Sequence, residues 1–303
     1  MKNRLGLVGI WLLALFPASP AVAQRLQGPI SIESAAVAGN VHMLTGRGGN
    51  IGLLVDDKGA ILVDDQFAPH ADAIVAAVKE ATPHPIRFLI NTHWHGDHTG
   101  GNAEFNSRGV VLVAHDNVRK RMSTEQFNEL FGRKTPPSPD AALPTVTFSE
   151  GMTFHWGKEE VRIVHVGNAH TDGDSFVHFV NAHVLHMGDV YFNGMYPFID
   201  VSSGGSLDGL IAAVEQALAM TDDKFKIIPG HGPLATRADL SSYRALLIDV
   251  RKIVGALIRE GKSLDQILAA APLAKYDAKW GRGFMNPKNF LRCVHAAMTK
   301  KPR

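Results

Sequence analysis

The sequence predicts a layered α+β fold in which two β-sheets pack face to face with helices on the outside. Three observations indicate this class. Of the 303 residues, 45% are hydrophobic and 20% are charged, which is typical of a globular protein with a sizeable core. Short apolar runs between turn residues indicate strands, and runs with apolar residues three and four positions apart indicate helices. Strands followed by helices occur twice along the chain, which predicts two sheet layers.

The first 23 residues have the pattern of a secretory signal peptide. Lys2 and Arg4 precede an apolar run over residues 5–16, and residues 21–23 (Ala-Val-Ala) supply a cleavage site with small side chains. The run is shorter than the roughly 20 apolar residues that a membrane span needs. We therefore expect cleavage after this site, a periplasmic or secreted mature protein and no stable membrane anchor. An uncleaved N-terminal anchor is the alternative.

The mature chain is expected to be formally neutral. Residues 1–23 contain two of the 31 Lys and Arg and none of the 29 Asp and Glu, which leaves 29 basic against 29 acidic residues. Nucleic-acid-binding proteins present a basic face that neutralises phosphates, so neutrality argues against a nucleic-acid partner. The single cysteine, Cys293, excludes an intrachain disulfide. We expect it to be a buried apolar residue.

The first half of the chain is predicted to contain short strands and one helix. Glycine-rich or Asp-Lys-Gly turns separate the first three apolar runs, which predicts a meander. Ile74, Val75 and Val78 form the apolar stripe of the helix. The predicted strands are residues 41–45, 51–55, 60–63, 87–90 and 110–114, and the predicted helix is residues 71–81.

The second half is predicted to repeat this pattern after a break. Four prolines between residues 135 and 144 predict a loop or linker. Ser206 is the expected N-cap of a helix over residues 207–220. The remaining predicted strands are residues 146–148, 161–166, 175–180, 184–186 and 225–228, and the remaining predicted helices are residues 239–260, a short one after 263, and 286–298.

The strongest functional signal is an H-x-H-x-D-H motif directly after a predicted buried strand. It places His93, His95, Asp97 and His98 within six residues. In an extended segment the first three side chains lean toward one side, and Gly96 lets the chain turn so that His98 reaches a second position. Imidazole and carboxylate groups suit zinc, and also iron or manganese. A surface histidine cluster without a function is the alternative.

Three more potential ligands follow at the ends of later predicted strands. His170, Asp189 and His231 each stand in a loop beside or near glycine. Each alone is a weak signal, because polar loop residues are ordinary. Together with the motif they make seven ligands, enough for two metal ions. His186 precedes Asp189 within a predicted strand, so we leave it out of the set.

The motif and the later His, Asp and His, in that order, resemble the metallo-β-lactamase superfamily of metal hydrolases. The resemblance covers about residues 41–233. It implies a single hydrolase domain over residues 24–303, an αββα sandwich of two mixed sheets flanked by helices, and C-terminal helices from about residue 237. It also implies zinc as the cofactor, with two ions expected and iron or manganese as alternatives. The implied ligands are His93, His95 and His170 for the first metal, Asp97, His98 and His231 for the second, and Asp189 as a bridge.

Two such metals predict hydrolysis by a metal-bound hydroxide, because a divalent ion lowers the pKa of its water from about 15.7 to about 7. Asp97 is expected to orient the hydroxide and take up a proton, and Asn193 to donate to a developing oxyanion. Asp64 is a candidate to hold the second nitrogen of a ligand histidine. Thr171 either does the same or starts a turn. Residues 46–51 form either a flexible loop over the site or an ordinary hairpin connection.

The expected substrate is a small molecule with a hydrolysable carbonyl. The run over residues 91–102 and the pair His170-Thr171 resemble secreted β-lactamases, and export places the protein where β-lactams act. These features favour β-lactamase-like amide hydrolysis. An aspartate at position 189 instead resembles glyoxalase II-type thioesterases and lactonases, so thioester or lactone hydrolysis is the alternative. A non-catalytic metal-binding protein on the same fold is a further alternative. No oligomeric state is predicted.

Overall fold

The computed structural model describes residues 30–299. Residues 31–299 belong to one compact unit. The predicted signal segment lies outside the described residues, so its cleavage stays a prediction. Within residues 30–299, none of the helices combines the length and the apolar character that a bilayer span requires.

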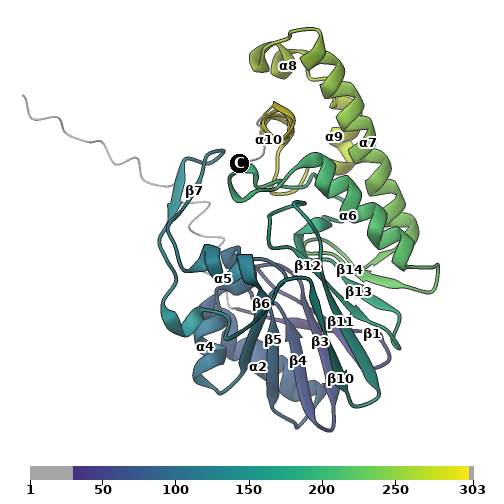
Figure 1. Cartoon of the computed structure of the whole chain (residues 1–303). Coiled ribbons are helices and arrows are strands. Elements are labelled where there is room, and N and C mark those ends of the chain that lie inside the picture. Colours follow the sequence, from purple (N-terminus) through teal and green to yellow (C-terminus); the bar gives the residue numbers. More distant parts are fainter. Residues whose placement is uncertain (1–29, 300–303) are drawn as a thin grey trace, which may run out of the picture. The chain divides into compact units, whose positions relative to one another are not determined.

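Two mixed sheets and their helices form the compact unit (Figure 1). The first sheet has seven strands in the order β1-β2-β3-β4-β5-β6-β9, namely β1 (Glu33–Ala38), β2 (Val41–Thr45), β3 (Ile51–Asp56), β4 (Gly59–Val63), β5 (Ile86–Ile90), β6 (Val111–His115) and β9 (Val146–Phe148). Strands β1 to β4 pair antiparallel, and β4, β5, β6 and β9 pair parallel. The parallel strands need crossovers, which the helices between them supply.

The second sheet has six strands in sequence order. They are β10 (Gly151–Trp156), β11 (Glu159–His165), β12 (Ser175–Phe179), β13 (Val184–His186), β14 (Lys226–Ile228) and β15 (Ala235–Thr236). Only β13 and β14 pair parallel in this sheet. A separate hairpin consists of β7 (Gln126–Asn128) and β8 (Arg133–Thr135).

The helices that were predicted begin and end close to their predicted boundaries. They are α2 (Ala71–Ala81), α3 (Gly96–Thr99), α4 (Asn102–Ser107), α5 (Asp116–Met122), α6 (Leu207–Met220), α7 (Arg237–Arg259), α8 (Leu264–Ala270), α9 (Ala274–Trp280) and α10 (Pro287–Thr299). Ser206 caps α6 as expected, because its side chain accepts from the Gly209 N–H. Helices α2 and α6 match the predicted ranges residue for residue.

Three apolar clusters show that the order of layers is helix, sheet, sheet, helix. The cluster between the sheets joins side chains of the first sheet, such as Ile61 and Ile90, to side chains of the second, such as Ile163 and Val177. A second cluster packs the outer face of the first sheet against α2. The largest packs the outer face of the second sheet against α6, α7 and α10. Figure 1 shows the same arrangement, which confirms the predicted αββα sandwich.

The predicted strands are confirmed to within two residues, but the division of the chain differs from the prediction. Strand β9 pairs parallel with β6, so residues 146–148 complete the first sheet rather than begin the second. The proline-rich segment 135–144 therefore connects the β7–β8 hairpin to the first sheet. It packs into the protein, with Ala142 and Leu143 buried.

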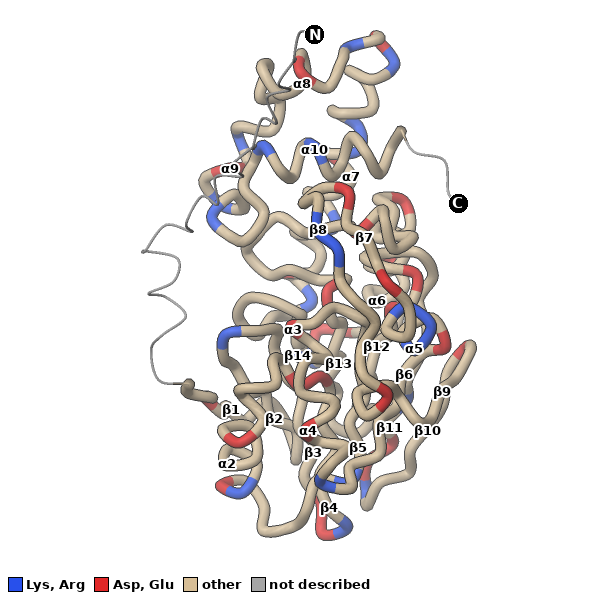
Figure 2. The backbone as a smooth tube through the Cα atoms, turned by 90° about the vertical axis from the view of Figure 1, so that its left-hand side faces the viewer, with Lys and Arg blue, Asp and Glu red and all other residues tan. Residues whose placement is uncertain are grey.

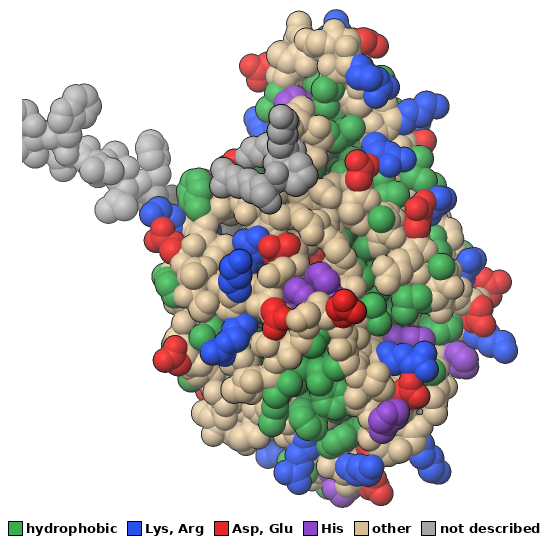
Figure 3. Space-filling view, in the orientation of Figure 1, with side chains coloured by type: hydrophobic (Ala, Val, Ile, Leu, Met, Phe, Trp, Pro, Cys, Tyr) green, Lys and Arg blue, Asp and Glu red, His purple; other side chains and the backbone are tan. Residues whose placement is uncertain are grey.

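Several short elements were not predicted. Strand β10 alternates exposed and partly buried residues, a period-two signal that the sequence contains. Strand β1 is mostly exposed and belongs to the sheet through its pairing with β2, so it has little hydrophobic pattern. Charged residues of both signs are interspersed along the backbone and over the face shown in space-filling form (Figures 2 and 3).

Candidate metal centre

All seven predicted ligands lie together at one end of the sandwich. His93 and His95 follow β5, and Asp97 and His98 lie on the short helix α3. The other three come from the β11–β12 connection, the turn after β13 and the loop after β14. They form two groups in which the possible ligand atoms lie within 4.8 Å of one another, His93, His95, His170 and Asp189 in the first and Asp97, His98 and His231 in the second.

Asp97 groups with His98 and not with the two preceding histidines. The chain leaves the extended conformation at His95 and enters α3 at Gly96, which turns the next side chains toward the second group. The expectation that Asp97 leans to the same side as His93 and His95 is therefore wrong. The division of ligands that the family resemblance implied is the one that the structure brings together.

Asp189 lies between the two groups. Its Oδ1 is 3.1 Å from His98 Nε2 and 3.4 Å from His231 Nε2. Its Oδ2 is 3.7 Å from His93 Nε2 and 3.6 Å from His170 Nε2. The carboxylate thus turns one oxygen toward each group, as a bridging ligand does.

The hydrogen bonds of His95 and His170 determine their tautomers. His95 Nε2 donates to Asp200 Oδ2 over 2.9 Å, and His170 Nδ1 donates to the Phe198 carbonyl over 2.7 Å. Neither acceptor can donate a proton in return. The Phe198 carbonyl has none, and the Asp200 carboxyl is ionised: burial alone would raise its pKa, but the hydrogen bond and charge of His95 hold it below its ordinary value. His95 Nδ1 and His170 Nε2 therefore face each other over 2.8 Å with lone pairs. Only a cation between them, a proton or a metal ion, relieves that repulsion.

The same reasoning applies to His98 and His93. Asp64 Oδ2 accepts from His98 Nδ1 over 2.8 Å and from the Thr92 hydroxyl over 2.8 Å. Because that hydroxyl has given its proton to Asp64, it accepts from His93 Nδ1 over 3.0 Å. In their neutral forms, which bind metal, both histidines therefore turn the lone pair of Nε2 inward. His93 Nε2 and Asp189 Oδ1 are buried without a hydrogen-bond partner among the described residues.

The donor set and its spacing fit divalent metal ions. Nitrogen and oxygen atoms about 2.0–2.2 Å from a tetrahedral zinc ion lie roughly 3.4 Å from one another. In the second group, His98 Nε2 and His231 Nε2 are 3.4 Å apart, and His231 Nε2 and Asp97 Oδ2 are 3.2 Å apart. Buried acceptors that converge without donors are costly unless a cation binds them. The cluster is therefore a His/Asp metal site, and its donors suit zinc, iron or manganese.

In the first group, burial alone would lower the pKa of His95, but the hydrogen bond to Asp200 and the charge of Asp200 raise it; burial governs the protonation of the other two histidines. It lowers the pKa of His170 to about 4 and holds that of His93 well below its ordinary value. Both imidazoles are consequently neutral, which is the form that binds metal.

Opposite charges dominate the second group. Burial alone would raise the pKa of Asp97, but the charge of His98 and the hydrogen bond from His231 hold it at about 2. Burial alone would lower the pKa of His231, but the Asp189 carboxylate raises it to about 9. The carboxylates thus draw positive charge to this group, and metal binding there is expected to release protons.

Solvent reaches the site from one side. The side chains of Asp97, His231 and His95 are 30%, 25% and 15% exposed. The other four ligands are buried. A substrate must therefore approach from the side of these three residues.

Asp64 lies where the sequence predicted support for a ligand histidine. Besides His98 and the Thr92 hydroxyl it accepts from the Thr92 N–H over 2.7 Å. Its backbone has φ 65°, a left-handed conformation that is uncommon for a residue with a side chain. Such strain persists where the surroundings over-determine it, and here three hydrogen bonds hold the carboxylate in place.

Asp200 is a functional residue that the sequence analysis missed. Its side chain is 2% exposed and receives the His95 Nε2–H. It also accepts from the backbone N–H groups of Ser202 and Ser203, which makes it the cap of a short turn. An aspartate two and three residues before such serines predicts only a turn, so no local signal marks its role at the site.

The segment over residues 46–51 packs against the metal site. Gly49 is buried, its N–H donates to the Asp97 carbonyl over 3.0 Å, and a Cβ there would lie 2.1 Å from a His98 ring atom. Asn50 Nδ2 donates to the carbonyls of Pro229 and Gly232 over 2.9 and 2.8 Å. Of the two alternatives for this segment, the structure shows the hairpin connection. The segment is the β2–β3 connection, and its Asn50 side chain is hydrogen-bonded to the loop that carries His231.

Other predicted supporting residues have different partners. Thr171 starts a turn, because its hydroxyl donates to Asp174 Oδ1 over 2.5 Å. Asn193 is not brought into the cluster, since its amide donates to the Pro233 carbonyl over 3.0 Å, so its oxyanion role stays a prediction. His186 is buried outside both groups, 3.2 Å from the Asn50 carbonyl. Cys293 is buried, as expected, and burial raises the pKa of its thiol to about 12.

Curated relatives match part of the chain. The alpha subunit of 2,4-dinitroanisole O-demethylase from Nocardioides sp. (strain JS1661) is 27% identical over 205 residues, which cover 66% of this chain and 58% of that protein. The hydroxyacylglutathione hydrolase of Brucella anthropi is 26% identical over 149 residues, or 48% of each protein. That of Gloeobacter violaceus is 28% identical over 158 residues, covering 51% of this chain and 54% of that protein. The chain thus spans about half the length of these relatives.

Solved structures share the fold. A metallo-β-lactamase from Pontibacter korlensis superposes with a TM-score of 0.58 and 19% identity, covering 72% of this chain and 99% of that one. DIM-1 metallo-β-lactamase superposes with a TM-score of 0.59 and 18% identity, covering 73% and 99%. The family model of the metallo-β-lactamase superfamily matches residues 44–231, a range that contains all seven ligands. The chain therefore belongs to the metallo-β-lactamase superfamily, and its His/Asp cluster fits that superfamily's metal site.

Proposed function

We propose that this protein is a hydrolase that uses two zinc ions to cleave a small-molecule carbonyl compound by adding water. The observation that carries the proposal is the convergence of five histidines and two aspartates in two adjoining groups. His93, His95, His170 and Asp189 would hold one ion. The three ligands of the second group, with Asp189, would hold the other. A pair of divalent ions supplies activated water at neutral pH and polarises a carbonyl oxygen.

Asp97 is the residue best placed to handle protons. Its carboxyl is ionised, partly exposed on the side from which a substrate approaches, and 3.2 Å from His231 Nε2. An ionised carboxylate at the solvent edge can orient a water molecule and accept its proton. No serine or cysteine nucleophile is required.

We propose a β-lactam amide as the first candidate substrate. The run over residues 91–102 supports it, because its residues resemble those of secreted β-lactamases. The expected export would also bring the protein to such compounds.

Thioesters and lactones are the second candidate, favoured by a specific observation. Asp189 turns one oxygen to each group, and an aspartate at this position resembles glyoxalase II-type thioesterases and lactonases. Two of the curated relatives are hydroxyacylglutathione hydrolases.

A substrate panel tests the function and ranks these candidates. The zinc-loaded protein is offered a penicillin, a hydroxyacyl thioester and a lactone, and Asp97→Ala is the matched inactive variant. We expect turnover of at least one compound that a chelator abolishes and added zinc restores. If the loaded protein leaves all three intact, the proposal is wrong. Turnover that persists with chelator would exclude metal-dependent hydrolysis.

A further inference from the structure

Three phenylalanine rings form a cluster that is partly open to solvent. The Phe131 ring centroid is 5.4 Å from that of Phe198 and 5.6 Å from that of Phe284, and the Phe198 and Phe284 centroids are 6.4 Å apart. Phe284 is 68% exposed and Phe131 is 41% exposed. Single exposed apolar residues are ordinary, but an exposed cluster of large ones marks a binding surface.

This cluster touches the metal site directly. The Phe198 ring stacks on the His95 ring at 5.8 Å and meets the His170 ring edge-on at 5.6 Å. Phe198 also supplies the carbonyl that holds His170 Nδ1. Phe131 and Phe284 therefore contact the Phe198 ring, which in turn contacts two predicted ligands. One of these, His95, is partly exposed to solvent.

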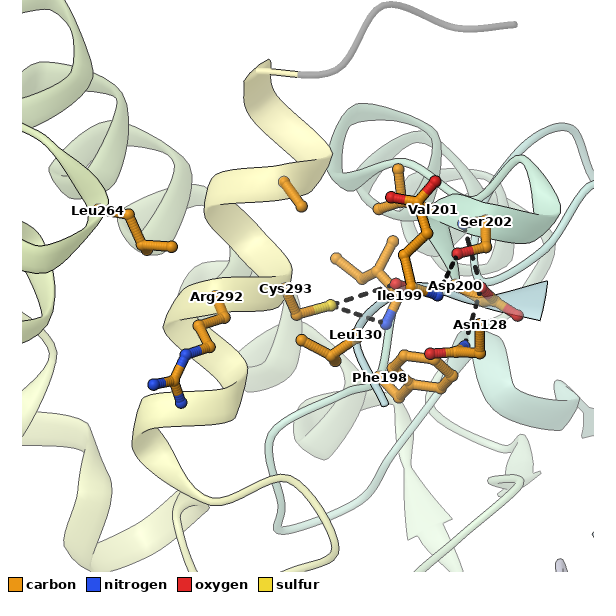
Figure 4. Close-up of a pocket in the computed structure, with 12 residues that line it drawn as sticks. Asn128, Leu130, Phe198, Ile199, Asp200, Val201, Ser202, Leu264, Arg292 and Cys293 are labelled. Atoms are coloured by element: carbon orange, nitrogen blue, oxygen red, sulfur yellow. Dashed lines mark hydrogen bonds between the residues drawn. The ribbon is translucent and has the colours of Figure 1, made fainter. Parts of the chain in front are cut away.

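The hairpin that carries Phe131 is held to the same support as His95. Asn128 Nδ2 donates to Asp200 Oδ1 over 3.2 Å, and the Glu129 N–H donates to the Ser202 hydroxyl over 3.1 Å. The Phe131 N–H in turn donates to Asn128 Oδ1 over 3.1 Å. Figure 4 shows Asn128 and Ser202 around Asp200, with Phe198 beside them. The position of the hairpin ring is thus fixed relative to the ligand histidine.

Phe284 comes from the C-terminal helices, beyond the residues 44–231 that the family model matches. It lies in the α9–α10 connection, which is fastened to the segment before Phe198. The Tyr196 N–H donates to the Trp280 carbonyl over 2.7 Å, and a Cβ on Gly283 would lie 2.6 Å from the Met195 side chain. The C-terminal part of the chain therefore adds a ring to the rim of the site.

There is also space for an apolar group beside the cluster. Phe198 lines a cavity of about 260 Å³ together with residues of the hairpin, α8 and α10 (Figure 4). Its apolar lining includes Leu130, Ile199 and Leu264. The lining also includes polar residues, among them Asp200 and Arg292. The volume exceeds the roughly 150 Å³ of a closed apolar cavity that holds benzene, so there is room for an aryl ring.

We propose that Phe131, Phe198 and Phe284 form an aromatic wall that binds an aryl group of the substrate while its carbonyl lies at the metal site. This inference rests on the proposed function, because it assigns the substrate class of the same site. The rings offer edges and faces to an aryl group, and aromatic pairs of this kind stabilise a complex beyond the area that they bury. The preferred substrates therefore carry a benzyl or similar group near the reacting carbonyl.

The test compares ligands that differ only in the ring. The zinc-loaded protein is titrated by NMR with phenylacetate and with acetate, and kcat/KM is measured for phenylacetyl and acetyl forms of whichever substrate is hydrolysed. Phe131→Ala and Phe284→Ala are the test variants. Phe127→Ala is the matched control, since Phe127 is 50% exposed on the same hairpin and has no ring contact with the wall among the described residues. Phe198 is left intact because it supports His170.

We expect wild-type protein to bind phenylacetate more tightly than acetate. Each test variant should weaken phenylacetate binding roughly three- to tenfold and leave acetate binding unchanged. KM for the aryl substrate should rise by the same factor with kcat unchanged, because the wall binds ground state and transition state alike. Phe284→Leu should restore part of the binding.

Failure of the wall and failure of the function give different results. Equal binding of the two carboxylates, or a loss in Phe127→Ala as large as in the test variants, overturns the aromatic wall. An absence of hydrolysis overturns the proposed function only, since the binding comparison does not depend on turnover. Thermal unfolding of each variant verifies that the fold is intact.

Discussion

Replacing Asp200 with asparagine is expected to weaken metal binding at His95 while leaving the fold in place. All the groups around the Asp200 carboxylate are donors. Oδ1 accepts from Asn128 Nδ2 and from the N–H groups of Ser202 and Ser203. Oδ2 accepts from His95 Nε2 and from the Ser203 hydroxyl. The Asn amide has only one acceptor oxygen, so its NH2 group must face one of these two sets.

Both placements of that NH2 group are unfavourable. If it faces His95, Nε2 must accept, and the ring proton moves to Nδ1, which faces His170 and the metal position. If it faces Asn128 and the two N–H groups, donors oppose donors and the short turn is destabilised. Losing one such supporting partner lowers metal affinity roughly 10- to 100-fold. That corresponds to about 1.4–2.8 kcal/mol of binding free energy.

The assay is a competition titration of zinc against a chelator of known affinity. We expect one of two binding steps to weaken in Asp200→Asn and the step assigned to the second group to stay within about twofold. Asp208→Asn is the matched control, because Asp208 is 79% exposed and pairs with Arg251 on the surface. Unchanged affinity in Asp200→Asn, or an equal loss in the control, would refute the reasoning about the His95 tautomer.

Three further predictions concern separate parts of the molecule. Asp97→Asn should lower kcat at least 100-fold and leave about one zinc per chain by elemental analysis; two bound zinc ions with full activity would contradict its role. Asn50→Ala removes two hydrogen bonds to the loop that carries His231. It should lower the free energy of unfolding in urea by about 1–3 kcal/mol and weaken binding of the second zinc ion. An unchanged urea midpoint would argue against a stabilising role for these hydrogen bonds. Burial and the stacked His165 ring lower the pKa of His115. His115 therefore binds a proton near pH 6.5 in the unfolded chain but only at lower pH in the folded chain. The free energy of unfolding is consequently highest above pH 6.5 and falls as the pH drops below it. His115→Asn should flatten this dependence between pH 5 and 7.5 in denaturant titrations, and an identical slope would count against it.

The sequence alone was sufficient for most of the fold and for the seven residues that cluster at the site. Helices such as α2 and α6 are encoded by apolar stripes and caps within a dozen residues, so their limits can be read from the chain. The candidate metal ligands could also be recognised in the sequence. Four of them stand together at residues 93–98, and the other three follow predicted strands near glycine. Strand β1 lacks such a pattern, because its exposed residues are held mainly by hydrogen bonds to β2.

Only the tertiary structure decided how the ligands are supported. The His95–Asp200 hydrogen bond joins residues 105 positions apart, and the Asn50–Gly232 bond joins residues 182 positions apart. No local pattern specifies such contacts, because they depend on where two sheets and the C-terminal helices place their loops. For the same reason the sequence did not indicate that Phe284 meets Phe198. Periodicity and capping act over one element, whereas the tautomers at this site and its aromatic rim result from side chains that meet only once the layers have packed.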